Sequence, residues 1–65
     1  MRIIFESSEA ARAGLGVVEE YGFSAVVQDQ TMTTDCPALL AAPAIMRGVG
    51  PERVERIEIV PGERP

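Results

Sequence analysis

Residues 3–27, IIFESSEAARAGLGVVEEYGFSAVV, carry the strongest secondary-structure pattern of the chain. The β-branched and aromatic run Ile3–Phe5 predicts a buried strand with apolar residues on both faces. A helix is expected over 8–21, because its apolar residues recur at helical spacing and a serine can cap its first turn. Gly22 supplies the left-handed residue that ends a helix, and a second strand is expected over 23–28.

Two strands joined by a helix predict a βαβ unit, with a right-handed crossover and two parallel strands. Further along the chain, residues 29–35 form a polar loop in this interpretation, and residues 37–42 form a short helix that Pro43 ends. A third strand is expected over 44–47. The alternation of apolar and charged residues in Ile57–Val60 predicts a final strand.

The expected fold class is therefore a small α/β domain. It would cover residues 1–60 as a single domain with an N-terminal βαβ unit, a short helix and a C-terminal strand or hairpin. Residues 52–56 would either form a helical turn or extend the last strand. Residues 61–65 would be a tail with no means of packing.

A thioredoxin-like arrangement is the alternative. Residues 42–45, a turn and residues 56–60 resemble the proline-led third strand and the hairpin of that fold. Its redox motif would fall near residues 7–10, which contain no cysteine. A thioredoxin-like scaffold is therefore compatible with the sequence, whereas dithiol oxidoreductase chemistry is excluded.

The composition excludes several kinds of catalytic site. The chain contains no His and no Lys, so a His-based triad, a His-ligated metal and a lysine Schiff base cannot form within it. No metal and no cofactor are expected. Six basic residues against ten acidic ones give a net charge of −4. An acidic chain without a basic stripe binds nucleic acid and anionic membrane surfaces poorly.

Cysteine content and hydropathy bear on the compartment. Cys36 is the only cysteine, so no internal disulfide can form, and the cytoplasm is the expected location. The longest uncharged apolar run, Cys36–Met46, contains two prolines and is shorter than the about 20 residues that span a bilayer. The N-terminal apolar run is too short for a secretory signal.

Cys36 is the candidate reactive residue. The thiolate is the reactive form of a cysteine, and unpaired N–H groups at a helix start lower the pKa of a nearby thiol. Cys36 would be the cap of the helix expected over 37–42, although the adjacent Asp35 would raise the pKa of the thiol. The alternative is that Cys36 is a small buried hydrophobic residue, since free cysteines are often buried.

Two serines and two glycines near the first helix are candidates for binding an anion or a phosphate group. Ser7 and Ser8 follow the first strand, so a small anion could meet the helix start there, with plain capping as the alternative. Gly14 and Gly16 lack the third glycine of a dinucleotide fingerprint, because that position is Glu19. Close packing of the helix on the sheet is the simpler explanation of these glycines.

A longer pattern spans the first half of the chain. A strand ends in Phe-x-Ser, the next helix contains an Ala, a Gly closes it, and an apolar strand and a polar loop lead to one cysteine. These features lie at Phe5, Ser7, Ala11, Gly22, 23–27 and Cys36. With them, residues 1–36 resemble a family of small sulfur- or selenium-carrier-like domains of unknown function. The chain has Pro37 where that family has a glycine after the cysteine, and its helix near the C-terminus is reduced.

The dipeptide Cys36-Pro37 is similar to the Cys-Pro-x-Pro helix start of the sulfur-relay carriers related to transfer-RNA thiolation. Here the fourth position is Leu39. The resemblance implies that Cys36 attacks a persulfide donor as a thiolate, holds the terminal sulfur and passes it to a protein partner. Such a carrier does not turn over alone, so the chain would not be an enzyme by itself.

A second hypothesis places the function in protein binding. The chain would be a non-catalytic adaptor, or a small subunit of a larger complex, in which Cys36 is buried and inert. Its small size and its apolar segment Ala38–Met46 favour a protein complex or a homo-oligomer. Exposure of Cys36 discriminates between the two hypotheses, because a carrier needs an accessible thiol.

Overall fold

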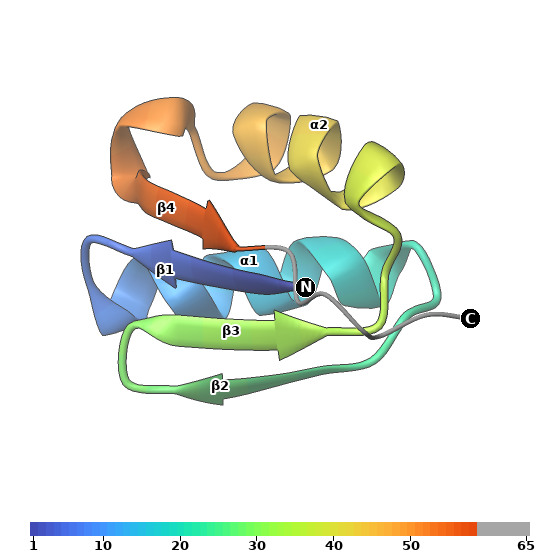
Figure 1. Cartoon of the computed structure of the whole chain (residues 1–65), viewed down its shortest axis with the longest axis horizontal. Helices are drawn as coiled ribbons and strands as arrows, with labels where there is room; N and C mark the ends of the chain where they lie inside the picture. Colours follow the sequence, from blue (N-terminus) through green and yellow to red (C-terminus); the bar gives the residue numbers. More distant parts are fainter. Residues whose placement is uncertain (59–65) are drawn as a thin grey trace.

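The computed structural model describes residues 1–58. The elements along the chain are β1 (Arg2–Phe5), α1 (Ser8–Glu20), β2 (Ala25–Gln28), β3 (Thr31–Thr34), α2 (Ala38–Gly48), the 3-10 helix η1 (Pro51–Arg53) and β4 (Val54–Glu58). The strands form one antiparallel sheet in the order β2-β3-β1-β4, with both helices on one face (Figure 1). The expected small α/β domain is confirmed.

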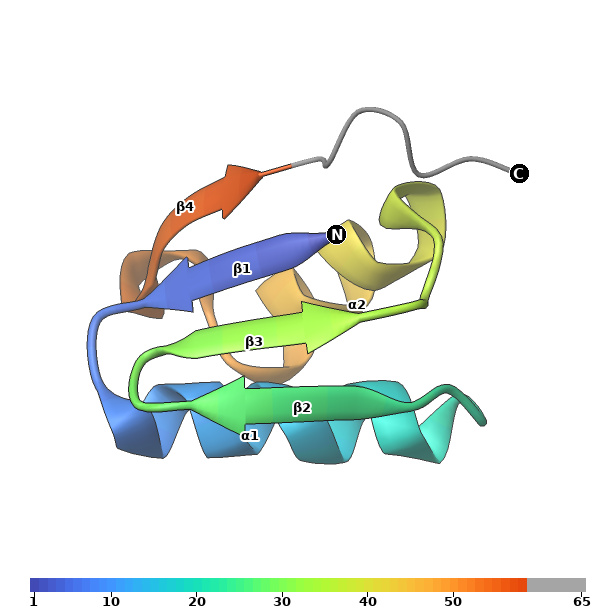
Figure 2. The same cartoon turned by 60° about the horizontal axis from the view of Figure 1, so that its bottom comes forward.

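The core lies between the sheet and the two helices. β1 alternates, so that Ile3 and Phe5 are buried on the helix side while Arg2 and Ile4 lie on the other face of the sheet. Met32 pairs with Ile3 in the neighbouring strand and is also fully buried. Figure 2 shows the sheet in front of the two helices. The face of the sheet toward the viewer is not covered by any helix of the described residues.

Helix α1 forms as its local sequence predicts. Ser7 is the N-cap, and its Oγ accepts a hydrogen bond from the N–H of Ala10 at 3.2 Å. The helix ends at Glu20 with Tyr21 as its C-cap, and Gly22 adopts the left-handed conformation with a φ of 89°. Phe23 then packs against the core, and its N–H donates to the carbonyl of Val18.

The two strands of the expected βαβ unit, β1 and β2, run in the same direction, as predicted. They do not pair with each other, because β3 lies between them and pairs antiparallel with both. The polar loop expected over 29–35 is therefore a strand at Thr31–Thr34. Threonines have strand propensity, and the alternate residues Met32 and Thr34 are buried.

A two-residue turn at Asp29 and Gln30 makes this hairpin possible. Asp29 adopts a positive φ of 54°, which aspartate tolerates better than most residues. The Gln30 side-chain amide donates to the carbonyls of Phe5 and Glu6, at 3.1 and 3.0 Å. These two bonds fix the turn against the end of β1, so β3 lies beside β1.

The expected end of the second helix at Pro43 is also wrong. α2 continues through Pro43 to Gly48, so the strand expected over 44–47 is helical. Pro43 is exposed, whereas Ala41, Ala44 and Ile45 on the opposite side of the helix are buried. Burial of that apolar side outweighs the hydrogen bond that the proline cannot donate. Residues 42–45 are thus not the strand of a thioredoxin-like arrangement.

The last described elements complete the sheet. Residues 52–56 divide between η1 and β4, so each of the two expectations holds in part. Ile57 and Glu58 belong to β4, whereas residues 59–60 of the expected strand and the tail 61–65 lie outside the described residues. β3 splits the unit β1-α1-β2, and β1 splits β3-α2-β4. This element order is that of ferredoxin-like βαββαβ domains.

Candidate functional site

Cys36 lies between β3 and α2 in the core. Its side chain is 3 % exposed and belongs to the buried cluster that includes Ile3, Met32 and Ala41. Its N–H donates to the Oγ1 of Thr34 at 3.1 Å, and that hydroxyl donates to the carbonyl of Ser24 at 2.7 Å. The cysteine is therefore held in place on its backbone side and covered on its side-chain side.

The electrostatics of Cys36 oppose thiolate formation. Burial raises the pKa of the Cys36 thiol above its ordinary value of 9.0, and the negative charge of Asp35 raises it further. The N-cap of α2 is Pro37, so Cys36 precedes the cap, and its expected position as the cap is wrong by one residue. Both effects disfavour the thiolate, which is the reactive form of a cysteine.

Ser7 and Ser8 lie at the start of α1. Ser7 uses its hydroxyl as the N-cap, as plain capping predicts, and Ser8 is the exposed first residue of the helix. The exposed carboxylates Glu6 and Glu9 flank this start and disfavour an anion there. An anion site at the two serines stays a prediction.

The candidate residues do not form one constellation. Ser7 follows the end of β1, and Cys36 follows the end of β3. Because β1 and β3 are antiparallel neighbours, these two positions lie at opposite ends of the sheet. A joint site of the serines and the cysteine is therefore not formed.

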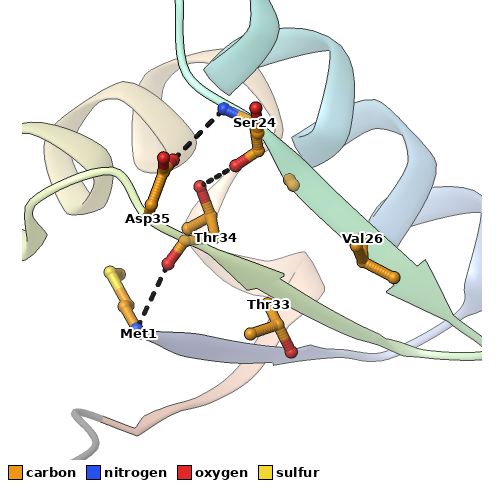
Figure 3. Close-up of a pocket in the computed structure, with 7 residues that line it drawn as sticks. Met1, Ser24, Val26, Thr33, Thr34 and Asp35 are labelled. Carbon is orange, nitrogen blue, oxygen red and sulfur yellow. Dashed lines mark hydrogen bonds between the residues drawn. The ribbon is translucent and has the colours of Figure 1, made fainter. Parts of the chain in front are cut away.

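An open depression lies at the end of the sheet where β2 begins and β3 ends (Figure 3). Its volume is about 460 Å³, and its lining residues are Met1, Ser24, Ala25, Val26, Thr33, Thr34 and Asp35. Sequence patterns do not predict it, because its walls come from three segments that only the sheet brings together.

The polar groups of this depression bond to one another. The N-terminal ammonium of Met1 donates to the carbonyl of Thr34 at 3.3 Å. The N–H of Ser24 donates to the Oδ1 of Asp35 at 3.2 Å, and the Thr34 hydroxyl bonds to Ser24 as described above. The bonds of Ser24 tie the start of β2 to the end of β3, and the bond of Met1 ties the N-terminus to the end of β3.

The outward side of α2 exposes large apolar side chains. Leu39 is 93 % exposed and Leu40 is 39 % exposed. Pro43 is exposed and Met46 is half-buried, and Leu39, Pro43 and Met46 follow one another at helical spacing on one line. We refer to Leu39, Leu40, Pro43 and Met46 as the α2 outer face.

Charge separates this face from the outer side of α1. Positions 38–46 of α2 carry no charged side chain, and the first charge on the helix is Arg47. On α1 the exposed positions include Glu9, Arg12 and Glu19. A helix that is apolar all round is expected to be buried on all sides. The sequence shows that residues 38–46 are uncharged. It does not show which of them face outward.

Comparisons of the chain with protein-family models, with curated proteins and with solved structures each found no match. Within residues 1–58, no group of three or more His, Cys, Asp or Glu side chains is placed to hold a metal ion. Over the same range, no helix has the length and apolar character needed to cross a membrane.

Proposed function

We propose that this chain is a small non-catalytic interaction protein that binds a protein partner through the α2 outer face. In this proposal Cys36 is a residue of the core. This function is that of the second hypothesis of the sequence analysis, a non-catalytic adaptor or a small subunit of a larger complex.

The observation that carries the proposal is the exposure of Leu39. Its side chain is 93 % exposed on a helix without charge over 38–46. Removing one leucine side chain from water contributes about 1.5–3 kcal/mol, so covering Leu39 and its neighbours favours binding. Scattered exposed leucines are common, but Leu39, Pro43 and Met46 form a continuous line.

A site-specific photocrosslink tests this function. A diazirine-bearing aliphatic amino acid replaces Leu39 in the full chain, and in a matched control it replaces the exposed Arg12 of α1. Illumination in cells that express the protein is expected to give a discrete protein adduct from position 39 and none from position 12. Absence of an adduct at position 39, or the same adduct from both positions, would contradict the proposal.

The persulfide-carrier function stays a prediction of the resemblance and has its own test. A carrier needs an accessible thiolate, whereas Cys36 is 3 % exposed and has a raised thiol pKa. With a structural cysteine, alkylation at neutral pH is expected only after the protein is unfolded. Rapid alkylation of the folded protein would revive the carrier function and would justify a persulfide-loading assay.

A further inference from the structure

The α2 outer face is apolar and lies on a helix without charge over 38–46. We infer that its partner is a second copy of this chain, with the two α2 helices packed antiparallel around a two-fold axis near Pro43. This inference rests on the proposed function, because it names the partner of the same surface.

The short length of α2 limits how Leu39, Pro43 and Met46 of one copy can pack against the same residues of a second copy. α2 has 11 residues, so at 1.5 Å per residue it is about 16 Å long. An antiparallel crossing at Pro43 puts Leu39 of one copy opposite Met46 and Arg47 of the other. The large apolar side chains at the two ends of the face then cover each other, and the smaller proline lies at the crossing.

Charge favours this orientation over a parallel one. Arg47 is the only charged residue of α2, so a parallel pair would bring two Arg47 side chains together. In the antiparallel pair their backbone positions are eight residues apart along the axis, about 12 Å, which exceeds the Debye length of about 8 Å at physiological salt.

The net charge of the chain limits which surface a second copy can use. Two copies each carry −4, so they repel each other wherever carboxylates meet. The outer side of α1 exposes three carboxylates, Glu9, Glu19 and Glu20, against one guanidinium, that of Arg12, so carboxylates outnumber cations in a contact between two copies there. The α2 outer face carries no carboxylate over 38–46, so the two copies meet there without like charges in contact.

Pro43 also removes the ordinary donor of one backbone carbonyl. A proline has no N–H, so the carbonyl of Leu39, four residues earlier, lacks its ordinary helical donor. In the antiparallel pair the guanidinium of the second copy's Arg47 lies opposite this carbonyl. It can donate a hydrogen bond to it, and the two-fold axis makes that bond twice.

The size of the face sets the expected affinity. The chain exposes 4173 Å², and a standard interface buries about 800 Å² of each partner, roughly a fifth of that surface. Four side chains on one short helix cover less than this. We therefore expect a weak dimer with a dissociation constant on the order of 0.1 mM.

Sedimentation of the full chain tests the dimer. Between about 10 µM and about 1 mM, the mass is expected to rise from 7.0 kDa toward twice that value. Leu39→Glu should remain monomeric because it buries carboxylates in the contact, while the control Arg12→Glu should dimerise like the wild type. Circular dichroism of each variant checks that it is folded. Residue 39 is exposed in the monomer, so Leu39→Glu should keep the helical signal of the wild type.

Disulfide trapping tests the orientation. Pro43→Cys should cross-link two copies rapidly under mild oxidation, because the two-fold axis passes near residue 43. Leu39→Cys should cross-link slowly, because the two copies of residue 39 lie about 12 Å apart along the axis in an antiparallel pair. Equally rapid cross-linking at 39 and 43 indicates a parallel pair and overturns the inference.

The photocrosslink at position 39 separates failure of the dimer from failure of the proposed function. An adduct of twice the chain mass supports both. An adduct of another mass, together with a wild-type chain that stays monomeric at about 1 mM, overturns the second copy and retains the interaction function. No adduct and no dimer overturn both.

Discussion

Gly14 of α1 lies directly against the ring of Phe5 in β1. A Cβ atom built at position 14 would lie 2.6 Å from Cζ of Phe5 and 3.3 Å from Cδ1 of Ile45. Phe5 is fully buried, so its ring has no free space in which to move. The glycine therefore sets how closely α1 approaches the sheet. Gly16, two residues later, has no atom within 4 Å of its built Cβ, so packing does not explain it.

Gly14→Ala and Gly16→Ala form a matched pair with opposite expected signs. Gly14→Ala should lower the free energy of unfolding by about 1–2 kcal/mol, because overpacking outweighs the gain in helix propensity. Gly16→Ala should raise the free energy of unfolding by about 0.5–1 kcal/mol, because the site is open and helical. Urea unfolding measures both values, and a stabilising Gly14→Ala would contradict the packing argument.

Thr34→Val tests the hydroxyl that joins Ser24 to Cys36. The substitution keeps the side-chain shape but removes the acceptor of the Cys36 N–H and the donor to the Ser24 carbonyl. We expect a loss of about 1–3 kcal/mol in the free energy of unfolding. Thr33→Val in the same strand is the control, because residue 33 is exposed, and its effect should stay within about 0.5 kcal/mol.

The buried thiol predicts a pH dependence of stability. The folded pKa of Cys36 is raised, so the folded state keeps its proton at pH values where the unfolded thiol ionises. The stability that the cysteine contributes is therefore complete below the unfolded pKa near 9.0 and is lost as the pH rises through the folded pKa. The free energy of unfolding of the wild type should approach that of Cys36→Ala as the pH rises from below 9.0 to above it. A constant difference between the two proteins over this range would indicate a thiol of ordinary pKa.

Pro43→Ala tests the cost of the proline inside α2. Alanine restores an N–H to the carbonyl of Leu39 and removes the ring from the helix, so the free energy of unfolding of the monomer should rise by about 1–3 kcal/mol. Pro37→Ala is the control, because residue 37 is the N-cap, where the missing N–H costs little. Equal effects of the two substitutions in dilute protein would show that Pro43 imposes no helical penalty.

The elements that could be predicted from the sequence are those fixed by local interactions. β1, α1 and the turn at Gly22 depend on apolar periodicity, on the Ser7 cap and on one glycine with positive φ, all within the first 22 residues. Each signal acts over a few residues, so the local sequence is sufficient to predict these elements.

The candidate site could be predicted only in part. Cys36 was identifiable as the one thiol, and the segment 38–46 as uncharged and apolar, from residue types alone. The direction in which each side chain points was not, because Pro43 favours a helix end and hides the continuous helical spacing of Leu39 and Met46. The burial of Cys36 likewise depends on residues far away in the chain.

Residue spacing and helix capping are sufficient to predict the α/β composition, the first strand and the capped helix, because these signals act within a few residues. The position of β3 between β1 and β2 and the passage of α2 through Pro43 depend instead on the folded chain. Both follow from burial of side chains such as Met32 and Ile45 by segments distant in the chain. That same packing covers the thiol of Cys36 and leaves Leu39 in water, because a helix can turn only one side toward the core.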